Sequence, residues 1–101
     1  MYQLNEEHYK TISIILAELD IDFFVFGSRT KGSAKKLSDL DLLIKQDFLQ
    51  KDLSILIERF ENSSLPFKVD IVLWSQISSS FKEQIKDDLI LWKGYEAVKN
   101  N

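Results

Sequence analysis

The sequence predicts a single domain of the α/β or α+β class, in which helices cover a small mixed β-sheet. Three short apolar runs rich in β-forming residues alternate with amphipathic segments of helical periodicity. The chain has 101 residues, of which 45% are hydrophobic, so it is long enough for one core and too short for two. We therefore expect residues 1–101 to form one domain.

The first predicted helix spans residues 6–19, followed by the first strand. Its apolar face recurs at helical spacing in Tyr9, Ile12, Ile15, Leu16 and Leu19. Asn5 is a candidate N-cap, and the acidic residues after it suit the positive end of a helix. The run IDFFVFGS, residues 21–28, then predicts a buried strand that ends at Gly27.

The middle of the chain predicts a short helix, a strand and a long helix. A polar, basic helix is expected from Arg29 to Leu37, with Ser28 near its N-cap. The run SDLDLLIK, residues 38–45, predicts the second strand. An amphipathic helix is expected over residues 48–61, with Asp47 as a possible cap.

The last third of the chain predicts one more strand and one more helix. A loop with the only proline leads to the third strand, KVDIVLW, residues 68–74. The last helix is expected from Ser78 to Lys93, ended by Gly94, and the polar tail after it is expected to fray. Its apolar stripe, which we expect to be core, consists of Phe81, Ile85, Leu89 and Trp92.

The composition excludes several classes of protein. The absence of cysteine rules out disulfides and thiolate metal sites, and the only histidine, His8, has no partner for catalysis and is expected to be structural or solvated. A formal net charge of -3 gives no general attraction for nucleic acid. No apolar run is long enough for a membrane span, and the first residues are acidic, unlike a signal peptide. We therefore expect a soluble cytoplasmic protein.

Three aspartates interrupt the apolar strands. Asp39 and Asp41 are two positions apart and share one face of their strand, and Asp70 can join them if the third strand lies alongside. Two unit charges 4 Å apart cost about 4 kcal/mol at an effective dielectric of 20, which a divalent cation would reverse. Oxygen ligands without cysteine favour Mg²⁺ or Mn²⁺, with nucleotide phosphates completing the ligand set.

The Gly27–Ser28 turn is suited to phosphate. Glycine lets an anion approach the backbone closely, and Ser28 with the following N–H groups can donate hydrogen bonds. Arg29 raises the local positive potential, as do three lysines whose roles the sequence leaves open, Lys31, Lys35 and Lys36. We therefore expect Gly27, Ser28 and Arg29 to bind nucleotide.

Each of these features also has a purely structural interpretation. A Gly-Ser turn is a common connector, basic residues at helical spacing often form a solvated face, and an isolated Asp-x-Asp at a strand end is usually exposed. Their combination in one chain is what favours a nucleotide site.

The combination resembles a known family. Gly27-Ser28, ten intervening residues, Asp39-x-Asp41, and Asp70 on a later strand are similar to the pattern of the DNA polymerase β-like nucleotidyltransferase superfamily, and most similar to its minimal nucleotidyltransferases. The likeness spans essentially the whole chain. Family members commonly read GSRARG where this chain reads GSRTKG, a change that leaves the Gly, Ser and Asp positions intact.

The resemblance implies a fold and a set of residue roles. It implies the DNA polymerase β-like fold, with catalytic Asp39, Asp41 and Asp70. By family analogy Asp39 and Asp41 would hold two Mg²⁺ ions, and Asp70 would be a third metal ligand or would activate the acceptor hydroxyl. Gly27 and Ser28 would hold the β and γ phosphates of ATP.

The resemblance also implies a partner. Minimal nucleotidyltransferases are similar to antitoxins paired with HEPN-domain toxins, and known members transfer AMP to a tyrosine of the toxin. The leading hypothesis is an adenylyltransferase antitoxin in a hetero-oligomer with such a toxin. Two alternatives remain open: a binding module that neutralises its partner by contact alone, and a nucleotidyltransferase that acts on RNA or a small molecule with a separate substrate-binding subunit.

Overall fold

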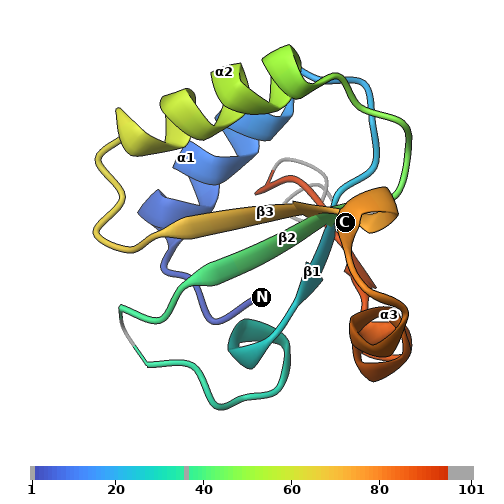
Figure 1. Ribbon diagram of the computed structural model, residues 1–101. Helices are drawn as coiled ribbons and strands as arrows, with labels where there is room; N and C mark the ends of the chain where they lie inside the picture. Colours follow the sequence, from blue (N-terminus) through green and yellow to red (C-terminus); the bar gives the residue numbers. More distant parts are fainter. Residues whose placement is uncertain (1, 36, 96–101) are drawn as a thin grey trace.

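The computed structural model describes residues 2–35 and 37–95 (Figure 1). The elements within these ranges are, in chain order, α1 Glu6–Leu16, β1 Phe24–Phe26, β2 Leu40–Ile44, α2 Gln50–Glu61, β3 Val69–Leu73, α3 Ser79–Ile85 and β4 Ile90–Leu91. Two single 3₁₀ turns, η1 Ser28–Thr30 and η2 Trp74–Gln76, follow β1 and β3. The three expected strands are therefore present, together with a fourth.

The strands form a mixed sheet in the order β3-β2-β1-β4. β1 pairs antiparallel with both β2 and β4, whereas β2 and β3 are parallel and are joined through α2. A parallel pair needs such a crossover, because the chain must return to the end of the sheet where it started. The expected small mixed sheet covered by helices is confirmed.

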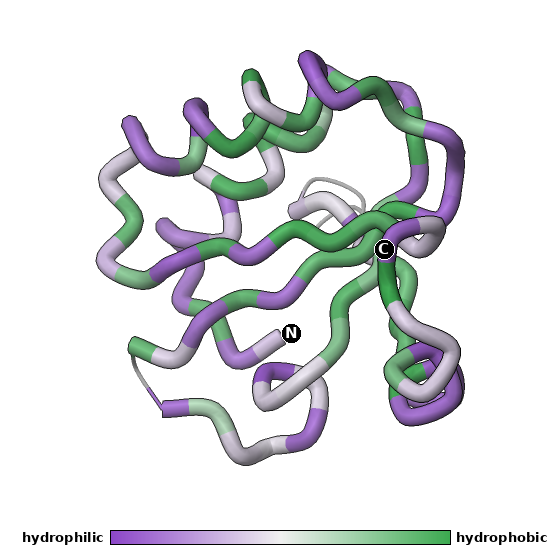
Figure 2. The backbone as a smooth tube through the Cα atoms, in the orientation of Figure 1, coloured by the Kyte–Doolittle hydropathy of each residue, from purple (hydrophilic) through white to green (hydrophobic). Residues whose placement is uncertain are grey.

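The helices divide between the two faces of the sheet (Figure 1). The larger core joins α1, α2 and one face of the sheet, around Ile12, Leu42 and Leu56. A smaller core joins α3 to the other face, around Phe26, Leu43 and Ile85. The strands are apolar along most of their length, with polar residues at the ends where each strand meets a loop (Figure 2).

The first helix begins as predicted and ends early. The Asn5 side chain accepts a hydrogen bond from the His8 backbone N–H at 2.8 Å, which confirms the N-cap. The helix ends at Leu16 instead of residue 19. The expected extension to residue 19 was wrong because the chain turns there, with the Leu19 N–H donating to the Leu16 carbonyl.

Two further helix boundaries differ from the prediction. The expected helix from Arg29 to Leu37 is only the 3₁₀ turn Ser28–Thr30, with Gly27 and not Ser28 at its N-cap. A positive φ of 75° at Gly32 is incompatible with helical geometry and explains why no longer helix forms. The second long helix starts at Gln50 with Leu49 at its N-cap, so the capping role expected for Asp47 was wrong.

The last predicted helix is half helix and half strand. Ser78, where the helix was expected to begin, caps α3 by accepting a hydrogen bond from the Phe81 N–H, but α3 ends at Ile85. Acidic residues follow Ile85, and their charges are unfavourable at the negative C-terminal end of a helix dipole. Ile90–Leu91 then pair with β1. Gly94 therefore ends no helix. The stripe expected to be one core face is divided between the two cores, with Trp92 in the larger one and Ile85 in the smaller.

No helix within the described residues is long and apolar enough to cross a membrane. The polar tail that was expected to fray lies, from residue 96 on, outside the described residues.

Candidate active site

Two of the expected carboxylates lie opposite each other in the sheet. Asp41 in β2 pairs with Asp70 in β3, and on its other side Asp41 pairs with Phe26 in β1. Directly paired residues point to the same face, so both carboxylates lie on the face that α3 partly covers. Asp39 lies at the entrance to β2, one residue before the strand begins.

The three carboxylates affect one another electrostatically. Burial raises the pKa of the Asp41 carboxyl to about 6, and the negative charges of Asp70 and then Asp39 add to that increase. The sheet register thus concentrates negative charge at one place. A site of this kind attracts a cation.

Gly27 lies beside this pair, at a position where a larger side chain would not fit. Its backbone has φ 83° and ψ -157°, a region that is essentially reserved for glycine. A Cβ atom at this position would lie within 3.0 Å of Asp41 Oδ2. The Gly27–Ser28 turn and the aspartate pair therefore meet, although they are distant in the sequence.

The turn after Gly27 is closed by local hydrogen bonds. The Thr30 backbone N–H and hydroxyl both donate to the Gly27 carbonyl, at 3.1 and 2.8 Å. The Ser28 residue that opens this turn is partly exposed. The turn is therefore fixed at one end of the loop that leads back to Asp39.

Arg29 has a different position from the one expected. Its side chain is buried, with 3% of its surface exposed. The guanidinium Nε and Nη2 donate to the Ser38 carbonyl at 3.1 and 2.7 Å, and Nη1 donates to the Gln3 carbonyl at 2.6 Å. It also stacks on the Phe67 ring, 4.4 Å from the centroid. A direct contact of Arg29 with nucleotide stays a prediction.

The lysines of the same loop are dispersed. Lys31 pairs with Asp88 at 3.1 Å, Lys35 is exposed, and Lys36 lies outside the described residues. Lys68 instead contacts the carboxylates, with its ammonium group 3.1 Å from Asp70 Oδ1. Sequence reasoning missed Lys68, although its position two residues before Asp70 on one strand places both on the same face.

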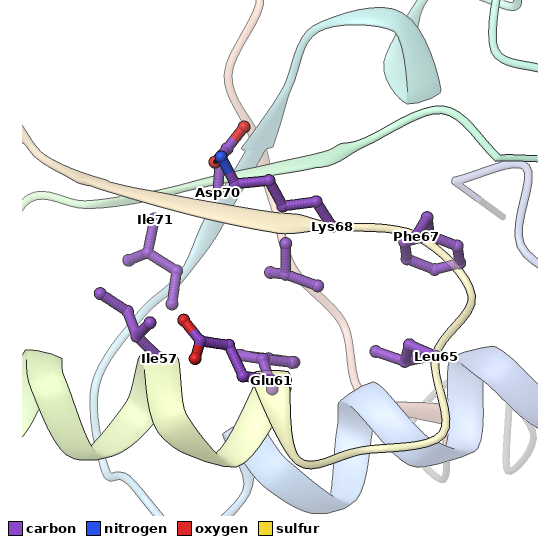
Figure 3. Close-up of a pocket in the computed structure, with 9 residues that line it drawn as sticks. Ile57, Glu61, Leu65, Phe67, Lys68, Asp70 and Ile71 are labelled. Carbon is purple, nitrogen blue, oxygen red and sulfur yellow. Dashed lines mark ion pairs between the residues drawn. The ribbon is translucent and has the colours of Figure 1, made fainter.

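A pocket of about 360 Å³ borders the site at the outer edge of β3. Lys68 and Asp70 extend to one side of this strand, whereas Ile71 and two residues of α2, Ile57 and Glu61, face each other on the other side (Figure 3). The pocket therefore has a mixed lining, with apolar side chains beside Glu61 and the ion pair at its upper rim. His8 lies nearby and packs edge-on against Phe67 with the ring centroids 5.5 Å apart, a structural role as expected.

The fit of a metal ion rests on the chemistry of the donors. Carboxylate oxygens are the ligands that Mg²⁺ and Mn²⁺ prefer, and the Asp41 carboxyl, which feels the negative charges of both Asp70 and Asp39, fits such a cation. In residues 2–35 and 37–95, however, no three His, Asp or Glu side chains converge into a formed metal site. The assignment of Asp39, Asp41 and Asp70 as metal ligands therefore stays a prediction.

Comparison with known proteins identifies relatives along most of the chain. The sequence model of the family described as "Nucleotidyltransferase domain" matches residues 9–92. A curated relative from Haemophilus influenzae, named "Probable protein adenylyltransferase MntA", is 43% identical over 89 residues, which cover 82% of this chain and 76% of the relative.

Two solved structures share the fold. One, described as a toxin–antitoxin with AMP-PNP, superimposes with a TM-score of 0.61 and 22% identity, covering 90% of this chain and 82% of that chain. The other, described as a mutant of the toxin–antitoxin MntA-HpeT, has a TM-score of 0.59 and 22% identity, covering 93% of this chain and 76% of that chain.

Proposed function

Because this chain belongs to the nucleotidyltransferase domain family, we propose that it transfers AMP from ATP to a tyrosine hydroxyl of a partner toxin, and so acts as an antitoxin. The observation that carries the proposal is the meeting of the Asp41–Asp70 pair with the Gly27 turn. A curated relative carries the name of a protein adenylyltransferase, and a solved structure with the same fold is described as a toxin–antitoxin with AMP-PNP. The toxin of this chain is proposed to be a HEPN-domain protein.

The proposed reaction needs groups that hold the phosphates of ATP and a group that accepts the proton of the attacking hydroxyl or binds the metal. The acceptor oxygen attacks the α-phosphorus of ATP, the bond from that phosphorus to the bridging oxygen breaks, and pyrophosphate leaves. Gly27 and Ser28 would hold the β and γ phosphates, because the glycine leaves room for an anion and the turn supplies N–H donors. Asp70 would accept the hydroxyl proton or complete the metal ligand set.

Divalent cations would be held by Asp39, Asp41 and Asp70, with two Mg²⁺ ions the leading expectation and Mn²⁺ the alternative. When bound, they would neutralise phosphate charge and stabilise both the entering and the leaving oxygen. The contribution of the chain itself is position. The parallel pairing of β2 with β3 fixes Asp41 beside Asp70. Because residue 27 has no side chain, the space beside Asp41 stays open for the phosphates.

The acceptor would approach along the β3 edge. Asp70 lies on this outer strand at the rim of the pocket, so a protein surface can reach it without displacing another strand of the sheet.

The proposal is tested by incubating the chain with ATP, Mg²⁺ and the product of the neighbouring gene. The expected result is a mass increase of one AMP on that protein, mapped by peptide sequencing to a tyrosine. Modified RNA or a modified small molecule would point to another acceptor. Full neutralisation of the partner without any modification would favour inhibition by contact and contradict the proposal.

A further inference from the structure

Arg29 is the one buried charged side chain among the described residues. Burial of a guanidinium is costly unless its donors are used, and here all three of its nitrogens donate to main-chain carbonyls. The carbonyl partners come from separate segments: Gln3 lies near the N-terminus and Ser38 in the loop before β2. The Phe67 ring covers the plane of the guanidinium. Arg29 therefore connects three parts of the chain.

Two of these three segments lead directly to candidate catalytic carboxylates. Ser38 immediately precedes Asp39, and its carbonyl accepts two hydrogen bonds from the one guanidinium. Both donors meet the same carbonyl oxygen, so they hold that oxygen in the plane of the guanidinium and restrain the peptide that joins Ser38 to Asp39. Phe67 lies two residues before the start of β3 and three residues before Asp70.

The remaining partner is held in an uncommon backbone conformation. Tyr2 and Gln3 have positive φ angles of 59° and 53°, which cost energy for residues other than glycine and persist only where the surroundings enforce them. In this conformation the Gln3 carbonyl accepts from Arg29, and its side-chain oxygen accepts from the Ala34 N–H at 3.0 Å. Gln3 thus holds the loop directly at Ala34 and indirectly, through Arg29, at Ser38.

We propose that Arg29 is a positioning residue, whose buried guanidinium fixes the end of the loop at Ser38 so that Asp39 is held in place for a nucleotide–metal complex. This role rests on the proposed function for its ligand, and it differs from a direct contact with phosphate. The negative charge of Asp39 is close enough to oppose the lowering of the Arg29 pKa that burial causes, which places the two groups near each other.

The test compares Arg29→Met with Arg59→Met. Arg59 is the only other arginine in the chain and pairs on the surface with Glu18, so its variant controls for loss of an arginine. The first readout is amide hydrogen exchange. Arg29→Met is expected to raise exchange at the amides of residues 33–39 about tenfold while leaving those of β1 and α2 unchanged. Arg59→Met should leave the loop amides at wild-type rates.

The second readout is ATP binding by calorimetry as a function of Mg²⁺ concentration. Arg29→Met is expected to raise the Mg²⁺ concentration for half-maximal binding by about 10-fold or more, as loss of residues that orient metal ligands does. ATP binding in EDTA should stay unchanged. Equal weakening of ATP binding with and without Mg²⁺ would indicate a direct phosphate contact and overturn the proposal, as would unchanged loop exchange.

A conservative variant keeps the proposal testable if Arg29→Met does not fold. Arg29→Lys preserves the charge but not the bidentate fork, so loop exchange and the Mg²⁺ requirement should lie between those of wild type and Arg29→Met. Wild-type values in Arg29→Lys would show that charge alone suffices and contradict the proposal. If the wild-type chain binds no ATP with Mg²⁺, the proposed function fails. The hydrogen-exchange comparison still tests whether Arg29 fixes the loop.

Discussion

Asp41 of β2 lies directly opposite Asp70 of β3 in the parallel ladder, beside the turn at Gly27. Hydrogen bonding in the sheet enforces this juxtaposition of two like charges, which would otherwise separate. The first consequence concerns the glycine. Gly27→Ala is expected to lower the free energy of unfolding by about 2–3 kcal/mol and to abolish ATP binding, because its Cβ would collide with Asp41 and its backbone strongly favours glycine.

Gly32→Ala provides the matched control in the same loop. Gly32 also has a positive φ, of 75°, but a Cβ there would meet nothing within 4 Å. This variant should lose about 1 kcal/mol from backbone strain alone and keep ATP binding. Urea unfolding and calorimetry measure both quantities, and equal effects of the two substitutions would contradict the steric role of Gly27.

The pKa of Asp41 predicts how stability depends on pH in EDTA. Because the pKa of about 6 in the folded chain exceeds the ordinary value of 3.8, the folded state binds more protons between these values and loses stability as pH rises through them. Asp41→Asn removes this loss. It should be more stable than wild type by about 1–2 kcal/mol at pH 7, a figure discounted for partial exposure, and equal to it near pH 4. Urea midpoints at both pH values measure the difference, and a gap that does not grow with pH would contradict the assignment.

Nucleotide and metal together should stabilise the fold. At ATP and Mg²⁺ concentrations about 100 times the dissociation constant, linkage adds about 2.7 kcal/mol, or roughly 10–20 °C in Tm for a domain of about 100 residues. EDTA should remove the increase. Differential scanning fluorimetry measures it, with Asp39→Asn as the variant that should lose the Mg²⁺-dependent part. An unchanged Tm at saturating ligand would argue against the site.

Lys68 and Asp70 form an exposed ion pair, from which a small effect on stability is expected. The Lys68 side chain is 72% exposed, so water screens the pair and Lys68→Met should change the free energy of unfolding no more than loss of another surface ion pair does. Lys86→Met, which removes a surface pair with Glu83, is the control. If Lys68→Met destabilises the fold by several times more than Lys86→Met, the ion pair is a structural element of the β3 edge.

The strands and the carboxylate pair could be predicted from sequence, since apolar runs with a single embedded aspartate indicate both strand and face. β4 could not. Its two residues, Ile90 and Leu91, lie between Leu89 and Trp92, which continue the helical spacing of α3, and only the unpaired edge of β1 determines that they form a strand. The burial of Arg29 was equally hidden, because its partners Gln3 and Phe67 come from distant parts of the sequence.

Asp39 and Asp41 are expected to support transfer of AMP, and labelled ATP tests this dependence. The wild-type chain and the Asp39→Asn, Asp41→Asn double variant are each incubated with the toxin partner, Mg²⁺ and ATP labelled at the α-phosphate or at the γ-phosphate. The wild type should label the toxin from the α-labelled ATP only, and the double variant from neither. Label from the γ-phosphate, or undiminished α-label with the double variant, would contradict the account.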